Sequence, residues 1–343
     1  MQIVYIGNRL AKWGFTPTSV ETLGERLQEL GEVVPYSDKK NPVLRLFDML
    51  WGIWKHRRTA EVVIIDTYSS SAFYFAFLCG WLCTFLDLPY IPVLRGGDLP
   101  RRLTLTPKLS RLFFGSAFKL VAPSNYLYNN FIEAGFEKTI VVPNYIDIVN
   151  YPFKQRVNPS PKILWVRSFH KTYNPNLAVD ILVLFKKHHP TAELCMVGPD
   201  KDGSMESFKM YAEQNGVLDC IRVMGKLEKR DWIALSADYD IFLNTTDFDN
   251  TPVSVMEAMA LGMLVVTTNA GGVPAIIEDN KEGYIFPCKD AISGASALEA
   301  IMEPTKAMQL SLNARQRASA WDWQVVRMQW NGLLNEIVDF RNK

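Results

Sequence analysis

The sequence of 343 residues has few cysteines, few histidines and almost no net charge. Five cysteines form neither a CxxC pair nor a metal-ligand spacing, so we expect buried free thiols at Cys79, Cys83, Cys195, Cys220 and Cys288. The four histidines include no pair at metal-ligand spacing that also has a carboxylate partner, and the sequence predicts no metal site. A formal net charge of +1 argues against a protein that binds nucleic acid or another polyanion.

A leader for secretion and a run long enough to span a bilayer are also missing. The uncharged run at residues 71–86 is sixteen residues long, just short of the ~17 to 25 that cross a membrane. Because it lies between two strand-like runs, we interpret it as a core helix. The first seven residues contain no basic leader followed by an apolar core and a cleavage site, and we expect a cytoplasmic protein.

Short apolar runs recur along the whole chain with helical patterns between them, which predicts parallel sheets covered on both faces. The chain exceeds the ~250 to 300 residues at which one core usually divides, so two doubly wound sheets are expected. A polar, proline-marked join at residues 144–161 separates them. The expected strands are residues 2–6, 32–35, 62–66, 90–94, 119–121, 139–142, 163–166, 193–197, 221–224, 240–243, 264–267 and 284–286.

The segment at residues 249–262 places two carboxylates eight positions apart across a loop-to-helix boundary. We expect Thr251 to be the N-cap and Pro252 to lie in the first turn, so that free backbone N–H groups can bind an anionic diphosphate. Asp249 then lies outside the helix, where it can accept hydrogen bonds from sugar hydroxyls. Glu257 lies inside it, where it can bind the paired hydroxyls of a ribose. The alternative is an ordinary amphipathic helix with an acid near its start.

The residues that follow extend this pattern to Gly262, the apolar strand at 264–267, Gly271-Gly272 and a Glu278-Asp279-Asn280 turn. Over some forty residues the chain resembles the large retaining glycosyltransferase family four (glycosyl transferases group one), which usually has Glu where this chain has Asp249. Residues 124–126 and 142–147 resemble the interdomain signature of the family. The resemblance implies the α/β fold GT-B, with two Rossmann-like doubly wound parallel-sheet domains that face an interdomain cleft.

In these terms we expect three parts of the chain. Residues 1–150 form an N-terminal acceptor-binding domain, and residues 151–320 form a C-terminal domain that binds the nucleotide sugar. Residues 321–343 form a helix that crosses back to the first domain, as the resemblance implies.

The resemblance also implies that cations hold the donor diphosphate. Arg167 follows the first strand of the second domain, and a strand-end arginine is costly unless it is paired or bound to an anion. Lys171 resembles the second cation, although the family commonly has it one residue later, at the position of Thr172. The alternative for Lys171 is a solvated loop lysine.

Several further positions complete the expected site. Asp249, Arg167 and Lys171 are assigned to catalysis. Donor binding is assigned to Glu257, Asn250, Thr251, Pro252, Val253, Gly198, Leu227 and Gly14. Acceptor binding is assigned to Trp13, Arg95, Gly97 and Asp98. The loop at residues 7–14 contains no G-x-G-x-x-G, so no dinucleotide site is supported, and a plain turn is the alternative for Gly14, Gly198 and the loop before Leu227. Arg95 occupies about the place where many relatives carry a histidine near the sugar.

Residues 41–58 combine aromatic and aliphatic residues with a basic end, as in a helix that lies on a surface. Residues 1–150 carry 16 Lys and Arg against 13 Asp and Glu. One interpretation is a peripheral contact with the inner face of an anionic membrane, close to a lipid-linked glycan. An ordinary packed helix is the other.

The sequence thus predicts a metal-independent hexosyltransferase that needs no cofactor beyond its donor substrate, a UDP- or GDP-sugar. The resemblance alone implies that the enzyme retains configuration. The expected acceptor is a glycan or lipid-linked glycan, as in the synthesis of a cell-surface polysaccharide. A nucleotide-sugar epimerase or hydrolase on the same fold, and a non-catalytic nucleotide-sugar-binding module, are the alternatives. The oligomeric state stays open.

Overall fold

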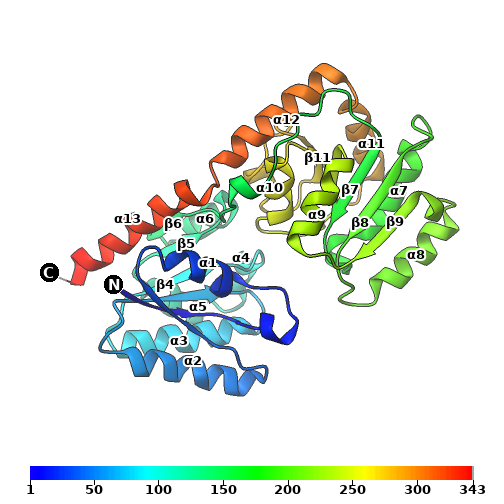
Figure 1. The fold of residues 1–343 in the computed structure, drawn as a ribbon. Helices are drawn as coiled ribbons and strands as arrows, with labels where there is room; N and C mark the ends of the chain where they lie inside the picture. Colours follow the sequence, from blue (N-terminus) through cyan, green and yellow to red (C-terminus); the bar gives the residue numbers. More distant parts are fainter. Residues whose placement is uncertain (342–343) are drawn as a thin grey trace. The chain divides into compact units, whose positions relative to one another are not determined.

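The computed structural model describes residues 1–341 and divides the chain into two compact units (Figure 1). Unit 1 consists of Met1–Pro143 and Gln324–Lys343, and unit 2 consists of Asn144–Trp323. Each unit contains one six-stranded sheet whose neighbouring strands all run parallel. Among the described residues, no helix is long and apolar enough to cross a membrane.

The sheet of unit 1 has the strand order β2-β1-β3-β4-β5-β6. Its strands are β1 (Gln2–Ile6), β2 (Glu32–Tyr36), β3 (Val62–Thr67), β4 (Tyr90–Leu94), β5 (Leu120–Ala122) and β6 (Thr139–Val141). The central strand β3, which reads Val-Val-Ile-Ile-Asp-Thr, is buried along its whole length. A continuous apolar run of this kind is typical of a parallel strand with helices on both faces.

Seven longer helices belong to the described residues of unit 1. They are α1 (Ser19–Leu27), α2 (Pro42–His56), α3 (Ala72–Phe85), α4 (Leu99–Leu105), α5 (Pro107–Gly115), α6 (Asn125–Glu133) and α13 (Trp323–Arg341). One core cluster joins the buried sides of α2, α3, α5 and α6 to the sheet. Helix α2 begins where the sequence predicts a start, because the Asn41 side chain accepts from the N–H groups of Val43 and Leu44 and Pro42 fills the first helical position.

The sheet of unit 2 has the strand order β12-β11-β10-β7-β8-β9. Its strands are β7 (Lys162–Val166), β8 (Glu193–Val197), β9 (Ile221–Gly225), β10 (Ile241–Asn244), β11 (Leu264–Thr268) and β12 (Tyr284–Phe286). Its longer helices are α7 (Pro175–Phe185), α8 (Ser204–Gln214), α9 (Lys229–Leu235), α10 (Val253–Ala260), α11 (Ala291–Ala300) and α12 (Pro304–Ser319).

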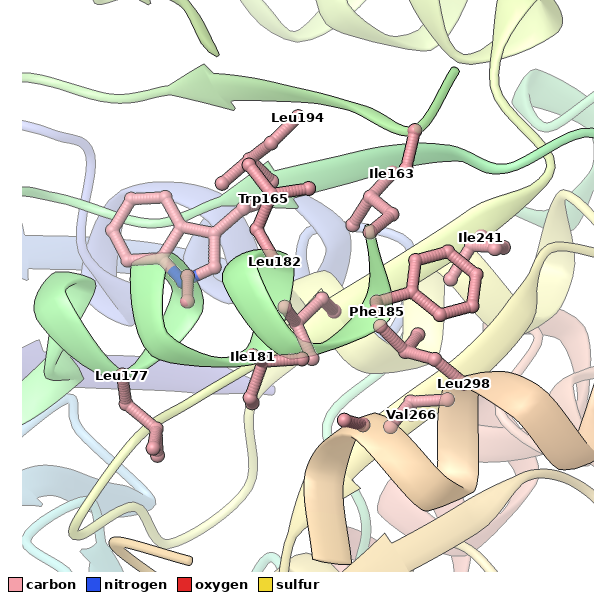
Figure 2. Packing of buried hydrophobic residues seen from close by; sticks show 14 of the residues in the cluster. Ile163, Trp165, Leu177, Ile181, Leu182, Phe185, Leu194, Ile241, Val266 and Leu298 are labelled. Carbon is pink, nitrogen blue, oxygen red and sulfur yellow. The ribbon is translucent and has the colours of Figure 1, made fainter. Parts of the chain in front are cut away.

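Two apolar clusters cover the sheet of unit 2. The first packs α7, α8 and α11 on the sheet, and Figure 2 shows Trp165 of β7 and Phe185 of α7 among its members. The second packs α9 and α10 against buried residues of β7, β10 and β11. Helices therefore lie on both faces, which confirms the predicted doubly wound sheet. All twelve expected strands are present, with ends that differ by at most one residue.

Two expectations about apolar residues are wrong in part. The run at residues 71–86 does contain a helix, α3, but this helix buries only one side, and Tyr74, Trp81 and Phe85 are exposed. An apolar composition alone could not show that one face of α3 is exposed to solvent. Of the five free cysteines three are buried, whereas Cys220 and Cys288 are half-buried.

Candidate functional site

The carboxyl ends of the unit 2 strands meet at one edge of the sheet, and the predicted donor residues follow several of them. Arg167 comes directly after β7, and Gly198 comes directly after β8. Asp249 lies between β10 and α10, and Gly271-Gly272 follows β11. This is the edge at which open α/β sheets bind their ligands.

Arg167 and Asp249 form an ion pair at this edge. Both side chains are largely buried, and the Arg167 guanidinium also lies over the ring of Tyr173, 4.6 Å from its centroid. Burial lowers the pKa of Arg167, and the negative charge of Glu257 opposes that shift. Nε of Arg167 is buried without a hydrogen-bond partner among the described residues. A buried unpartnered donor points to a ligand or a water at that position.

Three glycines allow the loops at this edge to approach one another. A Cβ at Gly271 would lie 2.1 Å from the carbonyl oxygen of Asp249, and one at Gly272 would lie 1.8 Å from that of Asn250. The N–H of Gly272 donates to the Asp249 carbonyl over 2.9 Å, so the glycine pair fixes the backbone beside the acid. Gly198 has φ near +154°, and a Cβ there would lie 1.8 Å from the Arg167 carbonyl oxygen.

Glu257 lies inside α10 and Asp249 lies outside it, as the sequence predicts. The Glu257 carboxylate accepts a 2.8 Å hydrogen bond from the Tyr151 hydroxyl and forms a 2.7 Å ion pair with Lys229. Burial, followed by the charge of Glu257, raises the pKa of Tyr151, so the phenol remains a donor. The carboxylate is therefore oriented by its neighbours, and Lys229, whose side chain is 63% exposed, covers it from the solvent side.

The predicted start of α10 is wrong by one residue. The helix begins at Val253, Pro252 is the N-cap, and the side chain makes no capping bond because proline carries no acceptor there. Thr251 is buried one residue earlier, and its hydroxyl has no partner among the described residues. The hydroxyl of Ser254, in the first turn, is also buried and unpartnered. Together with the free backbone N–H groups of a helix start, these hydroxyls can donate to an anion.

Lys171 lies in the loop between β7 and α7. It begins a short 3₁₀ turn, Lys171–Tyr173, and lines a pocket of about 310 Å³ with Asn174, Pro175, Asn176, Asp202, Gly203, Ser204 and Ser207. Its backbone N–H donates to Asp202, and Tyr173 rather than Lys171 contacts the Arg167 guanidinium. Its predicted role at a diphosphate stays a prediction.

The remaining donor positions of unit 2 differ in exposure. Asn250 is buried, and Val253 begins α10 with an exposed side chain. Leu227 follows β9 and packs against the second apolar cluster. The sequence did not single out Tyr151, Tyr173 or Lys229. Only Tyr173 carried a signal, since it lies beside the Asn174-Pro175 helix start six residues after Arg167.

The expected acceptor residues lie in unit 1, in two separate loops. Trp13 is exposed and its indole N–H donates to the Asp38 carbonyl over 2.9 Å, while Gly14 has φ near +84° and ends the same turn. Arg95 follows β4 and forms a 3.2 Å ion pair with buried Asp66, which also accepts from the Tyr5 hydroxyl over 3.0 Å.

Gly97 and Asp98 continue the loop that Arg95 begins, and lead into α4. Asp98 lies 3.8 Å from Arg101, with both side chains well exposed. Within residues 1–341, no three side chains of His, Cys, Asp or Glu come together in a way that could hold a metal ion.

Comparison with known proteins identifies the fold and the family. HepE of Anabaena, solved with UDP and glucose, superimposes with a TM-score of 0.76 at 18% identity, covering 98% of this chain and 100% of that one. The fold is therefore GT-B, with two Rossmann-like doubly wound parallel-sheet units. Residues 148–317 match the model of the family described as "Glycosyl transferases group 1", and the chain belongs to that family.

Curated relatives match over part of their length. Glycogen synthase of Mycobacterium tuberculosis (strain H37Rv) is 26% identical over 198 residues, which are 56% of this chain and 47% of that protein. The amylovoran biosynthesis glycosyltransferase AmsK of Erwinia amylovora is 27% identical over 223 residues, 61% of this chain and 54% of that one. The chain thus spans about half the length of these curated relatives.

Proposed function

We propose that the chain is a metal-independent, retaining glycosyltransferase. It transfers a hexosyl group from a nucleoside diphosphate sugar to a hydroxyl of a glycan or lipid-linked glycan, in the synthesis of a cell-surface polysaccharide. The observation that carries the proposal is the Arg167–Asp249 ion pair, held against Gly271-Gly272 at the start of the helix that contains Glu257. The structure of HepE with UDP and glucose supports a nucleotide-sugar donor, and the biosynthetic role of AmsK supports a polysaccharide product.

Each residue of the group has a chemical task in this proposal. Glu257, oriented by Tyr151, accepts hydrogen bonds from two ribose hydroxyls. Arg167 holds Asp249 through one nitrogen and offers its unpartnered Nε to the diphosphate, where negative charge grows as the donor bond breaks. The N–H groups at the start of α10 face the same charge. Asp249 accepts hydrogen bonds from sugar hydroxyls.

Transfer with retention needs no side-chain base in this scheme. The acceptor oxygen forms a bond to the anomeric carbon on the face from which the diphosphate departs. The bond from that carbon to the phosphate oxygen breaks, and a phosphate oxygen of the leaving group takes the acceptor proton. Catalysis then depends on position and on charge stabilisation rather than on a titrating residue.

The nucleotide specificity can be tested directly. A ligand that binds only the folded state raises the unfolding midpoint, so UDP, GDP, ADP and CMP are compared by thermal shift at equal concentration. We expect UDP or GDP to give the largest increase. Incubation of the matching nucleotide hexose without acceptor then distinguishes the reactions, since rapid release of nucleotide without acceptor indicates a hydrolase. No turnover with any glycan acceptor indicates a binding module, and either result contradicts the proposal.

Asp249→Asn tests the proposed role of Asp249 in catalysis. The carboxylate holds the sugar rather than the nucleotide, so we expect kcat to fall on the order of a hundredfold while the Kd for the free nucleoside diphosphate changes little. Asp249→Glu, which restores the acid usual in the family, should keep part of the activity. Glu193→Gln, at an exposed ion pair with Lys162, is the matched control and should behave as wild type. Normal turnover by Asp249→Asn would exclude a role in catalysis.

A further inference from the structure

Helices α2 and α3 of unit 1 pack against each other (Figure 1). Both helices carry large apolar side chains that are exposed. Phe85 is 75% exposed, Phe47 is 64% exposed and Trp51 is 57% exposed. We call this surface the aromatic face, and it consists of Val43, Leu44, Phe47, Trp51, Trp54, Tyr74, Trp81 and Phe85. Single exposed apolar residues are common on proteins, but eight of them on two packed helices indicate an interaction surface.

The aromatic face is separate from the sides that form the core. Helix α2 buries Met49, Gly52 and Ile53, whereas Phe47, Trp51 and Trp54 follow each other at three- and four-residue spacing on its open side. Helix α3 buries Phe73, Ala76, Cys79 and Cys83, whereas Trp81 and Phe85 lie one turn apart on its open side. Each helix therefore has apolar residues on two sides, and only one of these contributes to the core.

Most charges in the stretch that contains the aromatic residues of α2 are positive. Over residues 39–58 the only acid is Asp48, and its carboxylate accepts from the Ser37 hydroxyl. The Arg57 guanidinium lies 3.8 Å from the centroid of the Trp54 ring, and Trp51 and Trp54 stack at 5.5 Å. The cations of this stretch are Lys39, Lys40, Arg45, Lys55, Arg57 and Arg58. They lie before, within and after the apolar stripe.

We propose that the aromatic face binds the surface of an anionic lipid bilayer. Aromatic rings enter the boundary between headgroups and acyl chains, and lysine and arginine pair with anionic headgroups at the same depth. Charge decides between this partner and a second copy of the chain. A symmetric dimer would place the cations of one α2 against those of the other, because a twofold interface joins the same patch on both subunits. A negatively charged bilayer instead complements them.

Vesicle sedimentation tests the proposal with neither donor nor acceptor present, so its outcome is independent of glycosyl transfer. The full chain is mixed with vesicles of phosphatidylcholine alone or with one third phosphatidylglycerol, at low and at high salt. We expect the protein to sediment with the anionic vesicles and the bound fraction to fall as salt is raised, because headgroup attraction is screened. Equal binding to neutral and anionic vesicles, or binding to neither, would overturn the proposal.

Two sets of variants locate the contact. Phe47→Ser, Trp51→Ser and Phe85→Ser combined should lower the vesicle partition coefficient at least about tenfold. The reason is that three aromatic side chains can no longer enter the boundary between headgroups and acyl chains. Lys40→Glu, Lys55→Glu and Arg58→Glu combined should lower it by a similar factor on anionic vesicles. The second set leaves the apolar residues in place, so it carries the test if the first set does not fold. Ile292→Ser, a 73% exposed residue of α11 in unit 2, is the matched control and should bind as wild type.

Two results would place the contact elsewhere. Vesicle binding unchanged in both folded sets would show that another surface is used. Self-association would instead explain the aromatic face if three results came together. The wild-type chain would be a dimer by light scattering, the serine set would be a monomer, and neither would bind vesicles. Glycosyl transfer to a water-soluble acceptor is measured separately. If the glutamate set transfers sugar as wild type does, the proposed function holds whether or not the aromatic face binds vesicles.

Discussion

The carboxylate of Glu257 illustrates how far single residues of the site are fixed by neighbours from distant parts of the chain. Tyr151 donates to it across 106 residues of sequence, and Lys229 approaches it from the start of α9. The sequence alone indicated Glu257, because this residue lies in a motif of fixed spacing at residues 249–262. The same pattern could not show its partners, since their distance in sequence carries no regularity.

Replacing Glu257 tests its role in nucleotide binding. We expect Glu257→Ala to weaken the Kd for the preferred nucleoside diphosphate by about 1–3 kcal/mol, or roughly five- to 150-fold, because charged hydrogen bonds to the ribose are lost. Tyr151→Phe keeps the carboxylate but frees its orientation, and should give a smaller loss. Titration calorimetry measures both, with Glu193→Ala as the control. An unchanged Kd in Glu257→Ala would remove this residue from the site.

At the scale of elements, the twelve strands could be predicted because parallel strands are buried on both faces and appear as unbroken apolar runs. Helix boundaries were harder to predict from the sequence, as α10 shows. Its start depends on the backbone angles of Pro252 and not on the capping preference of Thr251. The open side of α3 was also hidden, because an apolar sequence is the same whether the helix packs on one side or on two.

The two-glycine loop after β11 gives a prediction at this scale. In Gly272→Ala the new methyl group would lie 1.8 Å from the Asn250 carbonyl oxygen, so the loop or the start of α10 must move. We expect a loss of about 1–3 kcal/mol in the free energy of unfolding of the unit that contains it, together with weaker donor binding. Gly115→Ala, where nothing lies within 4 Å of the new Cβ, should change stability by at most about 1 kcal/mol. Chemical denaturation that finds the two variants equal would refute this account of the loop.

Asp240 directly precedes β10 and links this strand to the segment at residues 154–160, which precedes β7, and this link should depend on pH. Its carboxylate accepts from the N–H and the hydroxyl of Ser160 and pairs with Lys154. Burial raises the pKa of Asp240, but the hydrogen bonds from Ser160 and Lys154 outweigh that effect and lower it overall. A carboxyl whose pKa is lower in the folded state stabilises the fold above its unfolded pKa of about 3.9, and this stabilisation is lost as pH falls through the folded pKa.

We therefore expect Asp240→Asn to reduce the free energy of unfolding most above about pH 5, with the difference from wild type shrinking below about pH 4. Urea titrations at several pH values measure the difference. A gap between wild type and variant that stays constant across this range would show that the Asp240 charge is not involved.

For the molecule as a whole, the proposed chemistry assigns the charge of the leaving diphosphate to Arg167 and to the start of α10. Turnover should then survive a chelator, and we expect the rate in EDTA to stay within about twofold of the rate in magnesium, since cationic side chains take the place of an ion. Steady-state assays in EDTA, with and without added magnesium or manganese, measure this. Activity that disappears in EDTA and returns with either metal would contradict the assignment.

Unit 1 consists of two segments that are far apart in the chain, and this sets the order in which the two units can finish folding during synthesis. The residues of α13 that unit 1 buries, Val326, Trp330, Leu333, Leu334 and Ile337, follow the whole of unit 2 in the chain. At about 5–20 residues per second, roughly ten to forty seconds separate the end of residues 1–143 from the appearance of this helix. During that interval the apolar surface that α13 covers, which includes Phe118, lies uncovered. Unit 2, whose residues are contiguous, can finish folding before the unit that precedes it.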